Sequence, residues 1–156
     1  MISILTLATA IVVLGEQEAG AQRESEIDAV KAANRSFYDA ASARDLARMD
    51  AVRAHEPYVR AIHPTSARVD AGWEIVRGGF QNLFEQFADI SVTMPEPSVQ
   101  VGENIAWIAG EELFKGRQTS GEELAATLLG TNVFERSGDR RLMVHHHVSV
   151  AQSPQQ

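Results

Sequence analysis

The pattern of apolar and polar residues predicts three helices in the first half of the chain. Apolar residues recur at helical spacing from Ser25 to about Ala43, in a shorter segment after Asp45, and again from about Gly72 to Phe87. Ser25 and Asp45 are suited to cap the first two helices, because short polar side chains accept hydrogen bonds from free backbone N–H groups. The first two helices are therefore expected to form a hairpin.

Segments that alternate between apolar and polar residues predict strands in the rest of the chain. One such segment, residues 58–63, precedes the third helix and ends at Pro64. Further strands are predicted at residues 89–94, 99–101, 105–115, 123–136 and 141–150, with Pro, Gly, Asn, Asp and Ser at the turns between them. Helices followed by an antiparallel meander predict an α+β domain, with the helices on one face of a curved sheet.

The last predicted strand carries three consecutive histidines between apolar residues. Regular alternation sends Leu142, Val144, His146 and Val148 to one face and Met143, His145, His147 and Ser149 to the other. Both faces are largely apolar, so this strand needs cover on both sides. It is predicted to be the centre of a ligand-binding sheet or part of a subunit interface, with His146 on the interface side.

The N-terminus resembles a signal peptide. Residues 1–15 form an apolar run of suitable length, although no Lys or Arg precedes it, and the small residues Ala19-Gly20-Ala21 predict cleavage after Ala21. The run is shorter than the roughly 20 residues that a membrane-spanning helix needs. We therefore expect residues 1–21 to be removed from an exported protein, periplasmic or secreted, whose mature form has no membrane segment. The alternative is that the segment stays uncleaved. If the segment is not a signal peptide, the protein is expected to be cytoplasmic.

Length, net charge and the missing residue types and motifs exclude several classes of function. The 156 residues fit one domain, expected at 22–151, followed by a disordered tail at 152–156. Twenty-one acidic residues against 14 basic ones give a net charge of −7, with no basic cluster, so nucleic acid is not expected as a partner. The chain has no cysteine, which excludes disulfides and thiolate catalysis. No nucleophile elbow or Gly-rich phosphate loop supports acyl or phosphoryl transfer.

Several short motifs occur in an informative order and spacing. They are Phe37-Tyr38-Asp39-Ala40-Ala41 with Asp45-Leu46, Ala61-Ile62-His63-Pro64, Gly72, Ala106-Trp107-Ile108, Asn132-Val133-Phe134 and His145-His146-His147-Val148-Ser149. Together they resemble the SnoaL-like group of the nuclear transport factor 2-like superfamily, which is similar in fold to ketosteroid isomerase. The resemblance covers residues 25 to about 151. It implies a cone-shaped half-barrel, with three N-terminal helices on the sheet around an apolar pocket, and a homodimer through the outer sheet face.

The resemblance also implies site residues. His63 stands where isomerase-like members place a general-base aspartate before a proline, and an imidazole there could accept and return a proton; alternatively, His63 hydrogen-bonds the following loop. Asn132 falls where the isomerase keeps a protonated carboxylic acid, and its amide could donate to an oxyanion or simply hold a strand bulge. Phe37 replaces the phenol that donates a hydrogen bond, so steroid isomerisation by the same residues is not expected.

Three more residues complete the predicted ligand contacts. Trp73 is expected at the pocket rim or in the core. His145 and His147 project from one strand face about 7 Å apart, and one of them is expected to face the pocket. With His63 they could bind a metal, but no carboxylate is placed to orient the rings. We therefore predict neither a metal nor a cofactor.

The sequence thus predicts a domain that holds a small, mostly apolar organic ligand. As an enzyme it would be a cofactor-free isomerase or lyase that moves a proton next to a carbonyl, with His63 as acid/base and Asn132 and His147 as polar contacts. The alternative is a non-catalytic ligand-binding or homo-oligomeric assembly module. The residues alone fit both hypotheses.

Overall fold

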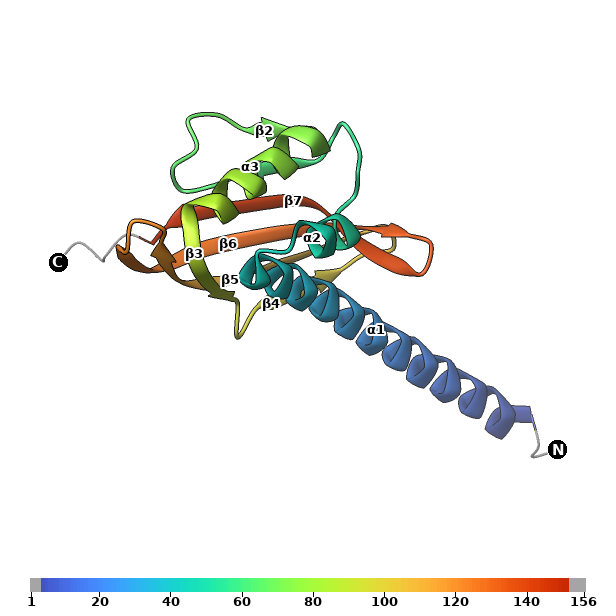
Figure 1. Ribbon diagram of the computed structural model, residues 1–156. Coiled ribbons are helices and arrows are strands. Elements are labelled where there is room, and N and C mark those ends of the chain that lie inside the picture. Colours follow the sequence, from blue (N-terminus) through green and yellow to red (C-terminus); the bar gives the residue numbers. More distant parts are fainter. Residues whose placement is uncertain (1–3, 152–156) are drawn as a thin grey trace.

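The computed structural model describes residues 4–151 as three helices and a seven-stranded sheet (Figure 1). The helices are α1 (Ile4–Ala43), α2 (Leu46–Val52) and α3 (Trp73–Gln86). The strands are β1 (Arg60–Ile62), β2 (Asp70–Ala71), β3 (Phe87–Thr93), β4 (Ser98–Val101), β5 (Ile105–Gln118), β6 (Glu123–Ser137) and β7 (Arg140–Val150). The helices pack on a mainly antiparallel, open sheet, which confirms the predicted α+β fold class.

The three longest strands form the middle of the sheet. The strand order is β2-β1-β7-β6-β5-β3, and β4 also pairs with β5, beyond the end of β3. Within the described region β1 and β7 are the parallel pair, and the other neighbours are antiparallel. The short strand β2 was not predicted, and it lies between the predicted strand at 58–63 and the third helix. Its pairing with β1 closes the loop that leads from the sheet to α3.

Alternation along the central strands separates a covered face from an open one. Ala106 and Ile108 on β5 are fully buried, whereas Ile105 and Trp107, which alternate with them, are exposed. The same period continues on β6, where Asn132 is fully buried. A strand with a helix layer on one side is expected to show this pattern. The inner face, towards the helices, therefore carries the core.

Helix α2 begins as predicted, but α1 does not. The Asp45 carboxylate accepts a hydrogen bond from the Arg48 backbone N–H at 3.0 Å and caps α2. Helix α1 begins at Ile4 and passes through Ser25 without interruption, so the prediction that Ser25 starts the helix is wrong. Good helix formers such as Glu, Gln and Ala fill the preceding residues, and no proline stops the helix.

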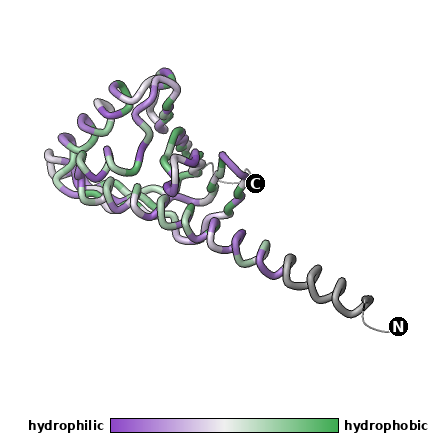
Figure 2. Tube along the Cα trace, turned by 90° about the vertical axis from the view of Figure 1, so that its right-hand side faces the viewer, coloured by the Kyte–Doolittle hydropathy of each residue, from purple (hydrophilic) through white to green (hydrophobic). Residues whose placement is uncertain are grey.

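Residues 17–25 of α1 extend away from the body of the domain (Figure 2). Residues 17–25 are exposed along this extension. Cleavage after Ala21 stays a prediction, which N-terminal sequencing of the protein recovered outside the cell would test. In the described residues, no helix is both long enough and apolar enough to cross a membrane. The predicted tail, residues 152–156, lies outside the described residues.

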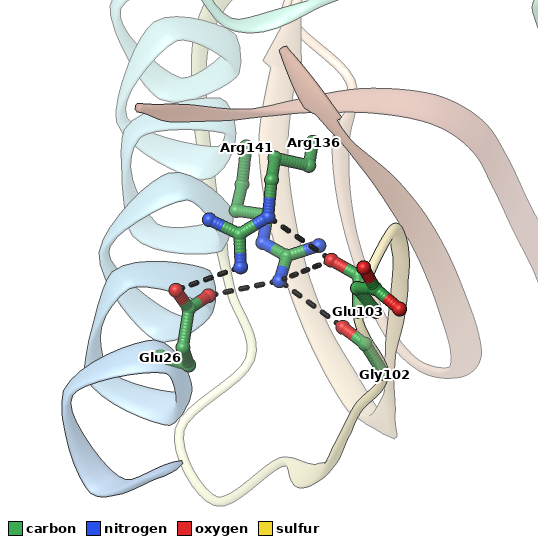
Figure 3. Close-up of polar contacts among 5 residues, drawn as sticks. All are labelled: Glu26, Gly102, Glu103, Arg136 and Arg141. Carbon is green, nitrogen blue, oxygen red and sulfur yellow. Dashed lines mark hydrogen bonds and ion pairs between the residues drawn. The ribbon is translucent and has the colours of Figure 1, made fainter. Parts of the chain in front are cut away.

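Glu26 makes the first charged contact between α1 and the sheet (Figure 3). Its carboxylate forms two salt bridges: Oε1 lies 2.7 Å from Arg136 Nη2, and Oε2 lies 2.8 Å from Arg141 Nη2. Arg141 Nη2 also lies 3.2 Å from the carbonyl oxygen of Gly102, in the turn between β4 and β5. We call Glu26, Arg136 and Arg141 the helix clamp, because they join α1 to the ends of β6 and β7.

A β-bulge interrupts the alternation in β7. Val133 pairs with His145 and Phe134 pairs with Met143, which leaves Val144 without a partner on β6. Met143 and His146 are therefore both buried, although they are an odd number of residues apart. The prediction that placed Met143 on the same face as His145 and His147 is wrong, because it assumed an unbroken strand.

Candidate functional site

A pocket of about 520 Å³ lies between α1, α3 and the inner face of the sheet. Its walls are mainly apolar, and Phe37 from α1 and Phe80 from α3 contribute aromatic rings to them. The titratable side chains in the wall are Tyr38, His63, Glu112 and His146. An apolar cavity of this size with a few polar groups is typical of a site for a small organic molecule.

His63 follows β1 and places its ring in the pocket wall. The ring packs edge-on against Phe80 with 5.6 Å between centroids, and it lies 5.5 Å from the His146 ring. The His63 backbone N–H donates to Ser66 Oγ at 2.9 Å, which holds the turn after the strand. Burial lowers the pKa of His63, although nearby Asp70 acts in the opposite direction. At neutral pH His63 is therefore an uncharged imidazole that can accept a proton.

Asn132 is fully buried behind the wall and connects three other polar side chains. Its Nδ2 donates to Asn34 Oδ1 at 2.7 Å and to Tyr38 Oη at 3.2 Å, and its Oδ1 lies 2.7 Å from His146 Nδ1. Because an amide oxygen only accepts, His146 carries its proton on Nδ1. Burial holds the pKa of His146 well below its usual range. His146 is thus a neutral imidazole whose Nε2 is left as an acceptor.

The same network reaches Glu112 on β5. Tyr38 Oη donates to Glu112 Oε2 at 2.9 Å, and burial raises the pKa of the Glu112 carboxyl to about 7. Burial and the neighbouring carboxyl raise the pKa of Tyr38 as well, so the phenol stays protonated. Gly130 leaves room for Met94, since an added Cβ there would lie 2.7 Å from Met94 Cε; it would lie at an ordinary contact distance of 3.6 Å from Glu112 Oε2 and Tyr38 Oη.

Arg53 is a buried cation behind the opposite part of the wall. It is 1% exposed, and burial lowers its pKa to about 9. Its guanidinium carbon lies 5.5–5.8 Å from the ring centroids of Phe37, Trp73 and Phe80. Within the described residues no carboxylate forms an ion pair with it. In addition to burial, its positive charge lowers the pKa values of His63 and His146.

The structure places three of the six predicted site residues at the pocket. Phe37 and His63 line the wall, and Asn132 lies directly behind it. Trp73 is buried outside the pocket, where its ring stacks on His55 with 4.9 Å between centroids. The roles proposed for these residues stay predictions, but their positions decide which of them could touch a ligand.

The expected places of the three consecutive histidines are corrected. After the bulge at Val144, His146 points inward and lines the pocket, whereas His145 is partly and His147 largely exposed, outside the set of lining residues. The rings of His145 and His147 lie 6.3 Å apart. Over the stretch that the structure describes, no three His, Asp or Glu side chains gather so that they could hold a metal ion.

Sequence reasoning missed three groups of this site. Glu112 shares the inward phase of Ile108 on the same strand, so alternation could have identified it. Tyr38 follows Phe37, and helical geometry turns it about 100° from that residue, but strands cover a wide arc of α1 and bury both rings. Nothing in the sequence around Arg53 predicts that it is buried, because residues distant in sequence cover it.

Solved structures with a fold similar to that of this chain carry the names of several different functions. A candidate dehydratase of the nuclear transport factor 2-like family from Streptomyces avermitilis matches with a TM-score of 0.76 and 20% identity, over 83% of this chain and 99% of that chain. A hexachlorocyclohexane dehydrochlorinase matches with a TM-score of 0.73 and 10% identity, over 85% and 90%. A candidate calcium/calmodulin-dependent protein kinase type II association domain from Thiobacillus denitrificans matches with a TM-score of 0.64 and 29% identity, over 78% and 94%.

Sequence comparison gives the family. No curated protein matches the chain. The family model described as the SnoaL-like domain matches residues 30–153, which include all seven strands and every residue of the pocket wall. The chain therefore belongs to the SnoaL-like domain family.

Proposed function

We propose that this domain binds a small, mostly apolar organic molecule and moves a proton on it without a cofactor, as an isomerase or lyase with His63 as acid/base. The observation that carries the proposal is an imidazole in the wall of an apolar pocket, packed between Phe80 and His146, where burial lowers its pKa. Such a ring takes a proton from a carbon next to a carbonyl, and the resulting imidazolium returns it.

Two neighbours support proton transfer at this end of the pocket. The buried positive charge of Arg53 would favour the negative charge that develops on a ligand when a proton leaves its carbon. Asn132 uses its amide within the protein and would act through His146, by fixing which ring nitrogen is free. The names of two similar structures, a candidate dehydratase and a dehydrochlorinase, describe eliminations, which also remove a proton from carbon.

The variant His63→Ala tests this function with 2-tetralone, a small apolar ketone that loses acidic C–H protons to base. Exchange of these protons for deuterium, followed by proton NMR in D₂O, is expected to fall at least about 100-fold in His63→Ala. Binding of 2-tetralone should change little. The wild-type rate should rise with pH while His63 loses its proton, and reach a plateau above 6.5, because the pKa of His63 is lowered from that value by burial.

His147→Ala is the matched control, because it removes an exposed imidazole outside the pocket wall. It should exchange 2-tetralone protons at the wild-type rate. Unchanged exchange in His63→Ala, or absence of 2-tetralone binding by the wild type, would contradict the proposed proton transfer by His63.

The outer sheet face supports a second candidate function, assembly. Large apolar residues on it are between 41% and 49% exposed: Ile105, Trp107, Leu113 and Leu129. An exposed apolar face of this kind is typical of an interaction surface. One similar structure is named as a kinase association domain. We propose that a second copy of this chain covers the face and forms a homodimer.

Replacing Trp107 by Glu is expected to convert the dimer into a monomer, because it places a charge in the middle of the apolar face. Sedimentation velocity over a range of concentrations measures the result. Ile75→Glu is the control, since Ile75 is 53% exposed on α3, away from this face. A wild-type protein that stays monomeric at all concentrations refutes the assembly proposal and leaves the pocket proposal unaffected.

A further inference from the structure

The Glu112 carboxyl is an acid in the pocket wall that no cation among the described residues neutralises. It is 5% exposed, and the salt bridges of the described region do not include it. Neither lysine nor arginine lines the pocket. Tyr38 engages Oε2 and leaves Oε1 for a ligand. Because buried charges are normally paired, the ionised form of this group lacks a partner that a ligand could supply.

The pocket has a basic end and an acidic end. The Arg53 guanidinium lies over the Phe80 ring, against which His63 also packs, whereas Glu112 is hydrogen-bonded to Tyr38 on α1. The residues that the structure places next to this carboxyl are uncharged: Leu128 pairs with Glu112 across β5 and β6, and an added Cβ on Gly130 would lie 3.6 Å from Glu112 Oε2 and 2.7 Å from Met94 Cε. A dipolar ligand would therefore enter this pocket in one preferred orientation.

We propose that the pocket selects ligands that carry a protonated amine at one end of an apolar body, with the ammonium at Glu112. The ammonium would donate a charge-assisted hydrogen bond to Oε1 while Tyr38 keeps its hydrogen bond to Oε2. The apolar body would lie along Phe37 and Phe80 towards His63. This inference rests on the proposed ligand-binding function of the same pocket, and it names the ligand class.

Isothermal titration calorimetry with three matched probes tests the inference. The probes are 2-phenylethylamine, which is cationic, 2-phenylethanol, which is neutral and of similar shape, and 3-phenylpropanoate, which is anionic. At pH 8 the wild-type protein should bind the amine at least about tenfold more tightly than the alcohol, and bind the propanoate most weakly. The amine affinity should fall about tenfold from pH 8 to pH 6, because the carboxyl with a pKa of about 7 must release a proton first.

Glu112→Gln should bind the amine and the alcohol with equal affinity and lose the pH dependence. Glu111→Gln is the matched control, because it removes the adjacent, exposed carboxylate from the same strand. It should retain the preference for the amine. Equal binding of amine and alcohol by the wild type overturns the inference, even if Glu112→Gln fails to fold, while leaving the pocket proposal standing. If 2-tetralone and all three probes fail to bind, both proposals fall.

Discussion

Replacing Glu26 by Gln is expected to lower the free energy of unfolding by about 3 kcal/mol, because it removes the acid from the helix clamp around a buried cation. The Arg141 side chain is 2% exposed, and its Nε and Nη1 atoms have no partner among the described residues. Without the carboxylate, the guanidinium would retain the Gly102 and Glu103 carbonyl oxygens at 3.2 and 3.5 Å. Urea denaturation measures the loss.

The pH dependence of this effect has a definite sign. In the folded protein, hydrogen bonds from Arg141 and Arg136 lower the pKa of Glu26 below its ordinary value of 4.5. The stabilisation by Glu26 is therefore fully present above the unfolded value of 4.5 and is lost as pH falls through the lower, folded value. The difference in stability between wild type and Glu26→Gln should shrink accordingly in acid.

Two variants control this measurement. Glu24→Gln removes an exposed carboxylate from the same helix and should change stability by less than about 0.5 kcal/mol. The double variant Glu26→Gln with Arg141→Met should recover much of the loss, since an apolar side chain no longer needs a counter-ion. Equal stability of wild type and Glu26→Gln would contradict the account of the helix clamp.

Replacing Asn132 by Leu is expected to lower the free energy of unfolding by at least about 3 kcal/mol, because each buried polar group left without a partner costs about 1–3 kcal/mol. Leucine has a similar size, but it leaves Asn34 Oδ1 and His146 Nδ1 without their hydrogen bonds. Tyr38 would keep its bond to Glu112, so its loss is smaller. Urea denaturation measures stability, and nitrogen NMR of the imidazole reports the loss of the fixed proton on His146 Nδ1.

Gln81→Leu is the control for this prediction, because it removes an exposed amide from α3, away from the outer sheet face. It should leave stability within about 0.5 kcal/mol of the wild type. If Asn132→Leu is as stable as this control, the buried network contributes no more than apolar packing would, and the fixed tautomer of His146 needs another cause.

The fold was predictable from the sequence because its signals are local and repeated. The helical spacing that predicted the third helix, the cap at Asp45 and the alternation that predicted the strands between residues 105 and 150 all act within a few residues. The structure confirms these elements, although a bulge at Val144 breaks the alternation within β7. The N-terminal start of α1 was missed, because a cap-like sequence at Ser25 does not end a helix whose preceding residues also favour helix.

The pocket was only partly predictable, because its polar groups depend on contacts that are distant in sequence. Alternation could have revealed Glu112, but its partner Tyr38 lies 74 residues earlier on α1. The burial of Arg53 depends on rings from α1 and α3. The bulge at Val144 has no local signal, and it decides that His146 rather than its neighbours lines the pocket.

The position of the extra residue in β7 decides which of the three consecutive histidines faces the pocket. Arg141 in the helix clamp and His146 in the pocket lie five residues apart, an odd spacing that one face of a regular strand does not accommodate. If the unpaired residue moved past His147, His145 and His147 would turn towards the ligand and His146 would turn outward. A shift of the bulge alone would thus change which imidazoles face the pocket, without any change in the sequence.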